Sequence, residues 1–161
     1  MQYEETFKSS VGWRDCLLRK QGVRPYAIRM IEKWIHELQN KYDYVKIDYY
    51  VIMPDHIHLI LFLTNDAGAH IGTPLQENGD VIINNPRMAL DNIIKWFKTM
   101  TTNEYINLVK QNVLPPFYKH IWQRDYRDRV IRNSGELYEI RKYIKNNPAK
   151  RMYEMGSMQD L

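Results

Sequence analysis

The segment 50–63 constrains the fold of this chain most, because it is strongly apolar and is broken by the pair Pro54 and Asp55. A proline next to an aspartate is typical of a turn or a bulge between strands. Aromatic and β-branched residues before the break predict a strand over 44–52, and the residues after it predict a strand over 56–63. Because the second strand is apolar on both faces, we expect it at the centre of a sheet.

Two histidines, His56 and His58, stand two residues apart in the second of these strands. Alternate residues of a strand point to the same face of a sheet, so both imidazoles are expected to project together. Two neighbouring imidazoles on an apolar strand are typical of a functional site, and binding a divalent metal is their commonest function. The pair is therefore the first candidate for a functional site.

Helical periodicity marks two segments on either side of these strands. Residues 25–41 place isoleucine and leucine at helical spacing and begin with a proline, so they predict an amphipathic helix. Residues 87–110 carry a rougher apolar stripe and predict a second helix. The residues 64–86 are rich in glycine, proline and asparagine, which predicts a long loop with a short hairpin over 81–83.

The C-terminal third predicts two short strands, 117–122 and 126–132, followed by a last helix. Asn133 is a good N-cap, and Glu136 three residues later completes a capping box. Pro148 cannot continue a helix without losing a hydrogen bond, so we expect the helix to end just before it.

These elements together predict an α+β fold, a ferredoxin-like or RRM-like antiparallel sheet with helices mainly on one face. The composition, 44% hydrophobic and 26% charged over 161 residues, is that of one globular domain. We expect this domain to cover 1–161, with 64–86 as a loop insertion and 152–161 as a tail. A single cysteine, Cys16, an acidic N-terminus and the lack of a long apolar run predict a cytoplasmic protein without a membrane span.

Positive charge is concentrated in the second half of the chain. Residues 1–86 hold 9 Lys and Arg against 11 Asp and Glu, a net charge of −2, whereas residues 87–151 hold 14 against 6, a net charge of +8. Cations interleaved with aromatic rings suit single-stranded nucleic acid, whose phosphates need charge and whose bases need stacking faces. Charge alone equally allows a solvated basic surface over an aromatic core. Within that half we expect Trp96 and Trp122 to be core residues.

Tyr143 and Asn147 are four residues apart in the predicted last helix, so they lie one turn apart on the same helix face. An amide oxygen is a suitable ligand for a hard divalent cation. A phenol can act as the nucleophile that forms a covalent intermediate. Taken without the two histidines, the residues would instead be interpreted as a boundary aromatic and a polar helix end.

In combination these segments resemble a known family. The sequence MPDHIHL at 53–59 looks like the HUH motif of the single-tyrosine HUH transposases. The sequences WQRDY at 122–126, VIR at 130–132 and YIKNNP at 143–148 look like the C-terminal signature of its REP-associated tyrosine transposase branch. The resemblance covers about residues 25–151.

The resemblance implies that His56 and His58 bind Mg²⁺ or Mn²⁺, that Asn147 occupies the third ligand position and that Tyr143 is the nucleophile. In this family the tyrosine attacks a phosphodiester in single-stranded DNA, leaving a 5′-phosphotyrosine and a free 3′-hydroxyl, and the reverse attack rejoins strands. The usual substrate is a hairpin with flanking single strand, such as a palindromic repeat element. We therefore expect a metal-dependent DNA transposase or endonuclease that acts as a monomer or a homodimer.

Basic residues near these motifs are the candidates for contacts with DNA phosphates. They are Arg124, Arg127, Arg129, Lys142, Lys145, Lys150 and Arg151. For any one of them, a solvated charge on a strand or helix end is an equally good interpretation.

The N-terminus departs from the family, whose members begin with an aromatic-rich strand near the HUH strand. Only residues 1–10 could supply that strand, and 3–7 match it poorly, so we expect a bare sheet edge. This departure motivates an alternative, a non-catalytic relative that holds structured single-stranded DNA or RNA. A histidine-triad-like nucleotide hydrolase is a third hypothesis, but it needs a third alternating histidine where this chain has Ile60.

Overall fold

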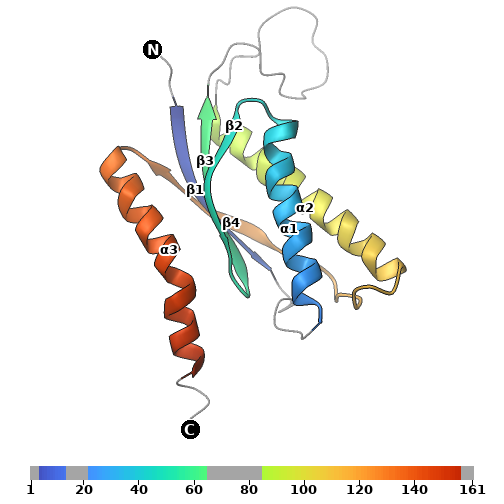
Figure 1. Cartoon of the computed structure of the whole chain (residues 1–161). Coiled ribbons are helices and arrows are strands. Elements are labelled where there is room, and N and C mark those ends of the chain that lie inside the picture. Colours follow the sequence, from blue (N-terminus) through green and yellow to red (C-terminus); the bar gives the residue numbers. More distant parts are fainter. Residues whose placement is uncertain (1–3, 14–21, 65–84, 157–161) are drawn as a thin grey trace, which may run out of the picture.

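The computed structural model describes residues 4–13, 22–64 and 85–156, which form a four-stranded sheet and three helices (Figure 1). The elements are, in chain order, β1 (Glu4–Trp13), α1 (Arg24–Lys41), β2 (Val45–Ile52), β3 (His56–Thr64), α2 (Pro86–Lys110), β4 (Trp122–Ile131) and α3 (Ser134–Gly156). The strand order across the sheet is β2-β3-β1-β4, and every neighbouring pair is antiparallel. The predicted α+β fold is thereby confirmed, as the βαββαβ order of a ferredoxin-like sheet followed by one more helix.

Helices α1 and α2 cover one face of the sheet, here called the inner face (Figure 1). Ile57, Leu59 and Leu61 of β3 are fully buried in the core beneath these helices, and β3 lies in the interior of the sheet as expected. Trp122 is also buried there, and its indole N–H donates to Thr101 Oγ1 of α2 at 2.9 Å. The expectation that Trp122 is a core residue is confirmed.

Helix α3 lies across the opposite face, here called the outer face (Figure 1). Its Ile140 and Ile144 pack with Ile60 of β3 and Ile131 of β4 in a second apolar cluster, here called the isoleucine cluster. This cluster is separate from the main core and much smaller. Helix α3 is therefore docked by far less apolar surface than α1 and α2.

The expected bare sheet edge is wrong, because β1 occupies the centre of the sheet between β3 and β4. Phe7, Ser9 and Val11 of β1 are buried, and Phe7 and Val11 belong to the main core. Thr6 and Lys8 alternate with them and so point to the outer face. The strand has few apolar residues, but pairing on both sides satisfies its backbone groups and outweighs its weak strand propensity.

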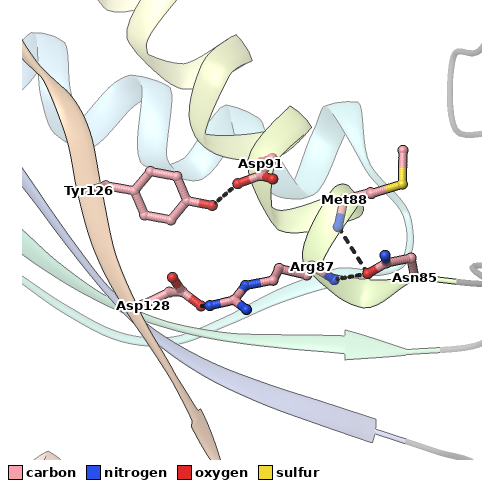
Figure 2. Close-up of polar contacts among 6 residues, drawn as sticks. All are labelled: Asn85, Arg87, Met88, Asp91, Tyr126 and Asp128. Carbon is pink, nitrogen blue, oxygen red and sulfur yellow. Dashed lines mark hydrogen bonds and ion pairs between the residues drawn. The ribbon is translucent and has the colours of Figure 1, made fainter.

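Strand β4 runs along one edge of the sheet as a single strand, so the prediction of two short strands at this place is wrong. Its charged residues are tolerated inside the strand because solvent reaches an edge. Figure 2 shows how α2 contacts this strand: the Tyr126 hydroxyl donates to Asp91, and Arg87 pairs with Asp128 at 3.4 Å. These contacts connect the first turns of α2 to the middle of β4.

The predicted start of α3, after Asn133, is confirmed, and its predicted end before Pro148 is wrong. The Glu136 N–H donates to Asn133 Oδ1 at 2.8 Å, and the Glu136 carboxylate accepts from the backbone N–H of Arg132 at 2.9 Å. The helix continues past Pro148 to Gly156. A proline removes one backbone hydrogen bond and crowds the carbonyl four residues earlier, and the helix continues here despite both costs.

Some expectations lie outside the described residues. They concern Cys16, nearly all of the 64–86 loop with its hairpin, and the end of the tail. Within the described ranges, none of the three helices combines the length and the apolar character that a bilayer crossing requires.

Candidate active site

The two histidines of β3 lie together on the outer face of the sheet, as their spacing predicts. Nε2 of His56 is 2.9 Å from Nε2 of His58, and the ring centroids are 4.5 Å apart. His58 is buried and His56 is half-buried. Two ring nitrogens thus converge on one point of the surface, with only part of it open to solvent.

The turn before β3 orients the first of these rings. The Met53 N–H donates to the His56 carbonyl at 2.8 Å, which closes the turn that holds Pro54 and Asp55. The Asp55 carboxylate accepts from Nδ1 of His56 at 2.6 Å. This hydrogen bond keeps the ring proton on Nδ1 and directs the Nε2 lone pair toward His58, which is the orientation of a metal-binding histidine.

Helix α3 brings Tyr143 and Asn147 to the same place. Nδ2 of Asn147 lies 3.2 Å from Nε2 of His58, across 89 positions of sequence. The ring centroids of Tyr143 and His58 are 6.4 Å apart. Tyr143 is 55% exposed, so a large substrate can reach it, whereas Asn147 is half-buried. All four predicted site residues therefore meet in one site.

A β-bulge in β2 helps to fix the position of α3. The register between β2 and β3 shifts at Asp48, so Asp48 and Tyr49 together oppose Ile60 of β3. Arg141 of α3 donates to both carboxylate oxygens of Asp48, from Nε at 2.7 Å and from a terminal nitrogen. Tyr49 packs against the isoleucine cluster. An ion pair and an apolar contact thus anchor the helix two residues from Tyr143.

The converging groups fit a hexacoordinate divalent cation. Two adjacent ligands of an octahedral ion, each about 2.1 Å from it, lie about 3 Å apart, which matches the 2.9 Å between the two Nε2 atoms. A half-turn of the Asn147 amide exchanges Nδ2 for Oδ1, an oxygen that hard cations accept. No group of three or more His, Cys, Asp and Glu side chains among the described residues is arranged to hold a metal. Oxygens of water and of a bound phosphate would complete the coordination of such a cation.

The candidate phosphate contacts of β4 divide between the two faces of the sheet. Arg127 lines a groove beside His56 on the outer face, and Arg129 pairs with Glu136 of α3 at 2.5 Å on the same face. Arg124 instead lines a larger groove, of about 980 Å³, between α2 and β4 on the inner side. Of these three arginines, only Arg127 and Arg129 share a face with the histidines.

The lysines of α3 do not face the histidines. Lys142 and Lys145 are exposed, and helical geometry places them about 100° and about 200° around the axis from Tyr143. The side chains of Lys150 and Arg151 lie outside the described part of the chain.

The groove beside the histidine pair has a volume of about 530 Å³ and crosses the outer face of β1 and β4. Ser10, His56 and Arg127 are among the side chains that line it. A Cβ at Gly12 would lie 2.7 Å from Oε1 of Gln123, so a larger residue here would displace the Gln123 side chain, which also lines the groove. The groove has room for part of a nucleotide chain. Arg127 and Asp125 of β4 line one side, and His56 with Asp55 lines the other.

Sequence reasoning missed Lys8 as a residue of this site. Lys8 of β1 stands opposite Ile60 on one side and Arg129 on the other. Its Nζ lies 4.8 Å from the centroid of the Tyr143 ring. Burial, and secondly the charge of Arg129, lowers the pKa of Lys8. No motif marks this lysine, and only the register of β1 could have found it.

Comparison with known proteins finds a relative in sequence and solved structures of similar fold. No family model matches the chain. An uncharacterized protein of Haemophilus influenzae is 29% identical over 105 residues, which is 65% of this chain and about half, 54%, of that relative. The solved structure of a REP-associated tyrosine transposase bound to a REP hairpin superposes with a TM-score of 0.57 and 18% identity, covering 91% of this chain and 68% of that one.

The chain shares the fold of that transposase. A second solved structure, from Deinococcus radiodurans, covers 89% of this chain and 91% of its own at 13% identity. Its TM-score of 0.47 is too low to support an argument. At 18% identity the likeness to the first structure extends to the fold, and a shared fold does not by itself imply a shared chemistry.

Proposed function

We propose that this protein is a metal-dependent tyrosine transposase or endonuclease that cleaves and rejoins single-stranded hairpin DNA through a 5′-phosphotyrosine intermediate. One observation carries the proposal. An exposed tyrosine and an amide on α3 meet two imidazoles on β3, although the two segments are far apart in the sequence. A shared fold with a transposase bound to a hairpin agrees with this assignment.

The residues divide the chemistry among them. Bound Mg²⁺ or Mn²⁺, held by His56, His58 and Asn147, would polarise the scissile phosphate and stabilise charge on its oxygens. Asp55 keeps the first imidazole in the ligating tautomer. The Tyr143 oxygen forms a bond to phosphorus while the bond from phosphorus to the 3′-oxygen breaks. One proton leaves the phenol and one joins the 3′-oxygen, and the reverse attack restores the phosphodiester.

DNA would reach this centre along the outer face of the sheet. The groove beside His56 is open to solvent and carries Arg127. Its guanidinium can pair with a phosphate, while the open surface between β1 and β4 admits the sugar.

The test is the formation of a covalent adduct. The whole chain is incubated with Mn²⁺ and a pool of end-labelled DNA hairpins with randomised single-stranded flanks, and the products are separated on a denaturing gel. We expect a protein–DNA adduct that disappears in Tyr143→Phe. Tyr138→Phe is the matched control, because Tyr138 is another exposed tyrosine of α3: its exposed fraction is 63%, against 55% for Tyr143. An adduct that persists unchanged in Tyr143→Phe contradicts the proposal.

A second result would favour the alternative function. If the hairpins bind without any adduct and the binding ignores both chelator and Tyr143→Phe, the chain only holds nucleic acid. The reason for that alternative was an expected gap in the sheet, and β1 fills the position.

A further inference from the structure

Lys8 is a cation beside the proposed nucleophile. Its position opposite Ile60 places it on the outer face, beneath α3. Its Nζ lies over the ring of Tyr143, at 4.8 Å from the centroid. An ammonium in this position is attracted by the aromatic face. Because Lys8 is half-buried and sits on a central strand, its reach is more restricted than that of an exposed lysine.

The surroundings of Lys8 favour an incoming anion. Arg129 is its neighbour on β4, and that guanidinium is occupied by Glu136. In the part of the chain that the structure describes, no carboxylate forms an ion pair with Lys8. Burial and Arg129 both disfavour its charged form and lower its pKa. A negatively charged group that entered here would offset both effects.

We propose that Lys8 is a catalytic residue, whose ammonium binds a non-bridging oxygen of the phosphate that Tyr143 attacks. The inference rests on the proposed function and goes beyond it, because it assigns to β1 a residue that no sequence motif marks. When the oxygen of Tyr143 bonds to phosphorus and the 3′-oxygen leaves, the phosphate keeps its negative charge. Lys8 stays paired with it in the phosphotyrosine, and no further reactant is needed.

The position of Lys8 also distinguishes it from the other lysines near Tyr143. Lys142 and Lys145 belong to the same helix as the tyrosine and point elsewhere. Lys8 belongs to the sheet, like His56 and His58. A phosphate held between Lys8 and a cation on these imidazoles would lie against the sheet, beneath the tyrosine that α3 supplies.

A purely structural role is the competing explanation, in which Lys8 only covers the tyrosine ring. Lys8→Met keeps the aliphatic stem and removes the charge, and Lys8→Arg keeps the charge. Lys46→Met is the matched control, because Lys46 is an exposed lysine on strand β2. All variants are assayed for melting temperature, for hairpin affinity and for the single-turnover rate of adduct formation.

We expect Lys8→Met to slow adduct formation by about 10²–10³-fold, the usual effect of removing one group that stabilises transition-state charge. Melting temperature should stay close to that of the unaltered chain. Hairpin affinity should fall only to the level that the unaltered chain shows for a hairpin without charge at the attacked phosphate, and Lys8→Arg should recover most of the rate. Lys46→Met should form adduct at the unaltered rate. An unaltered rate in Lys8→Met, or a loss that merely follows a lower melting temperature, overturns the proposal.

A second measurement depends on charge alone and needs no metal. The adduct maps the scissile phosphate, and a hairpin with a neutral methylphosphonate at that position is then compared with the ordinary hairpin in EDTA. The unaltered chain should bind the charged hairpin more tightly, and Lys8→Met should lose this difference. Equal discrimination by both proteins overturns the inference about Lys8. The proposed function itself would then still stand, provided that Tyr143→Phe abolishes the adduct.

Discussion

Truncating Ile144 should undock α3 without unfolding the sheet. Ile144 is fully buried, and it belongs to the isoleucine cluster rather than to the main core. Ile144→Ala removes three carbons, worth about 0.8 kcal/mol each in transfer free energy. A residual cavity brings the expected loss to about 2–5 kcal/mol. Since the cluster is the main apolar contact of α3, we expect this loss to fall on the docking of the helix.

Hydrogen exchange measures this directly. A loss of about 2 kcal/mol corresponds to roughly 30-fold faster exchange of the α3 amides, whereas the amides of β1 and β3 should stay protected. Adduct formation should fall as well, because Tyr143 and Asn147 leave the histidines when α3 detaches. Ile35→Ala, in the main core, is the control: it removes the same atoms but should destabilise the whole domain.

The reasoning about separate clusters would be refuted by one pattern. If Ile144→Ala accelerates exchange in β1 and β3 as much as in α3, the helix and the sheet unfold as one unit. Ile144→Val sets the scale, since it removes one methylene and should cost about 0.5–1.5 kcal/mol.

Two further predictions concern the metal and pH. Mn²⁺ should raise the melting temperature of the unaltered chain, since a ligand at 100 times its Kd stabilises the folded state by about 2.7 kcal/mol. His58→Ala should remove this shift in melting temperature, and His36→Ala should keep it. A shift that survives in His58→Ala contradicts metal binding at this site. The Arg132 N–H, followed by the charge of Arg129, lowers the pKa of Glu136, so its ionised form stabilises the fold above the usual Glu pKa of about 4.3. This contribution to stability is lost as the pH falls through the lowered pKa of Glu136. Urea denaturation should therefore find Glu136→Gln less stable than the unaltered chain at pH 7 and nearly equal to it at low pH. A difference in unfolding free energy that does not change with pH contradicts this account.

Periodicity predicted the elements whose apolar pattern is strong. Strand β3 and helix α1 were predicted to within one or two residues, because β3 is a continuous apolar run that follows a turn signal and α1 carries a clear helical period. Strand β1 was not, since its apolar residues are few and its stability comes from two neighbours that a local pattern does not reveal. The end of α3 was predicted wrongly because a proline usually ends a helix, whereas α3 continues past Pro148.

Those parts of the site that lie within a single helix or strand could be predicted from the sequence. The spacing of the two imidazoles, and that of Tyr143 and Asn147, each follow from one element and its period. The meeting of the two pairs required the resemblance, since nothing in either segment specifies the other. Lys8 required the register of β1, and the anchor between Asp48 and Arg141 required a bulge. The first depends on pairing between strands far apart in the sequence, and the second depends on a register shift within the β2–β3 hairpin that no local pattern marks.

The charged composition of β4 has a consequence for how this protein meets other molecules of its own kind. The open edge of a sheet offers unpaired N–H and C=O groups to any extended peptide, which is a route to aggregation. Half of the ten residues of β4 are charged, with both signs: Arg124, Asp125, Arg127, Asp128 and Arg129. A second chain that added a strand here would partly dehydrate these charges, which disfavours growth of the sheet along this side.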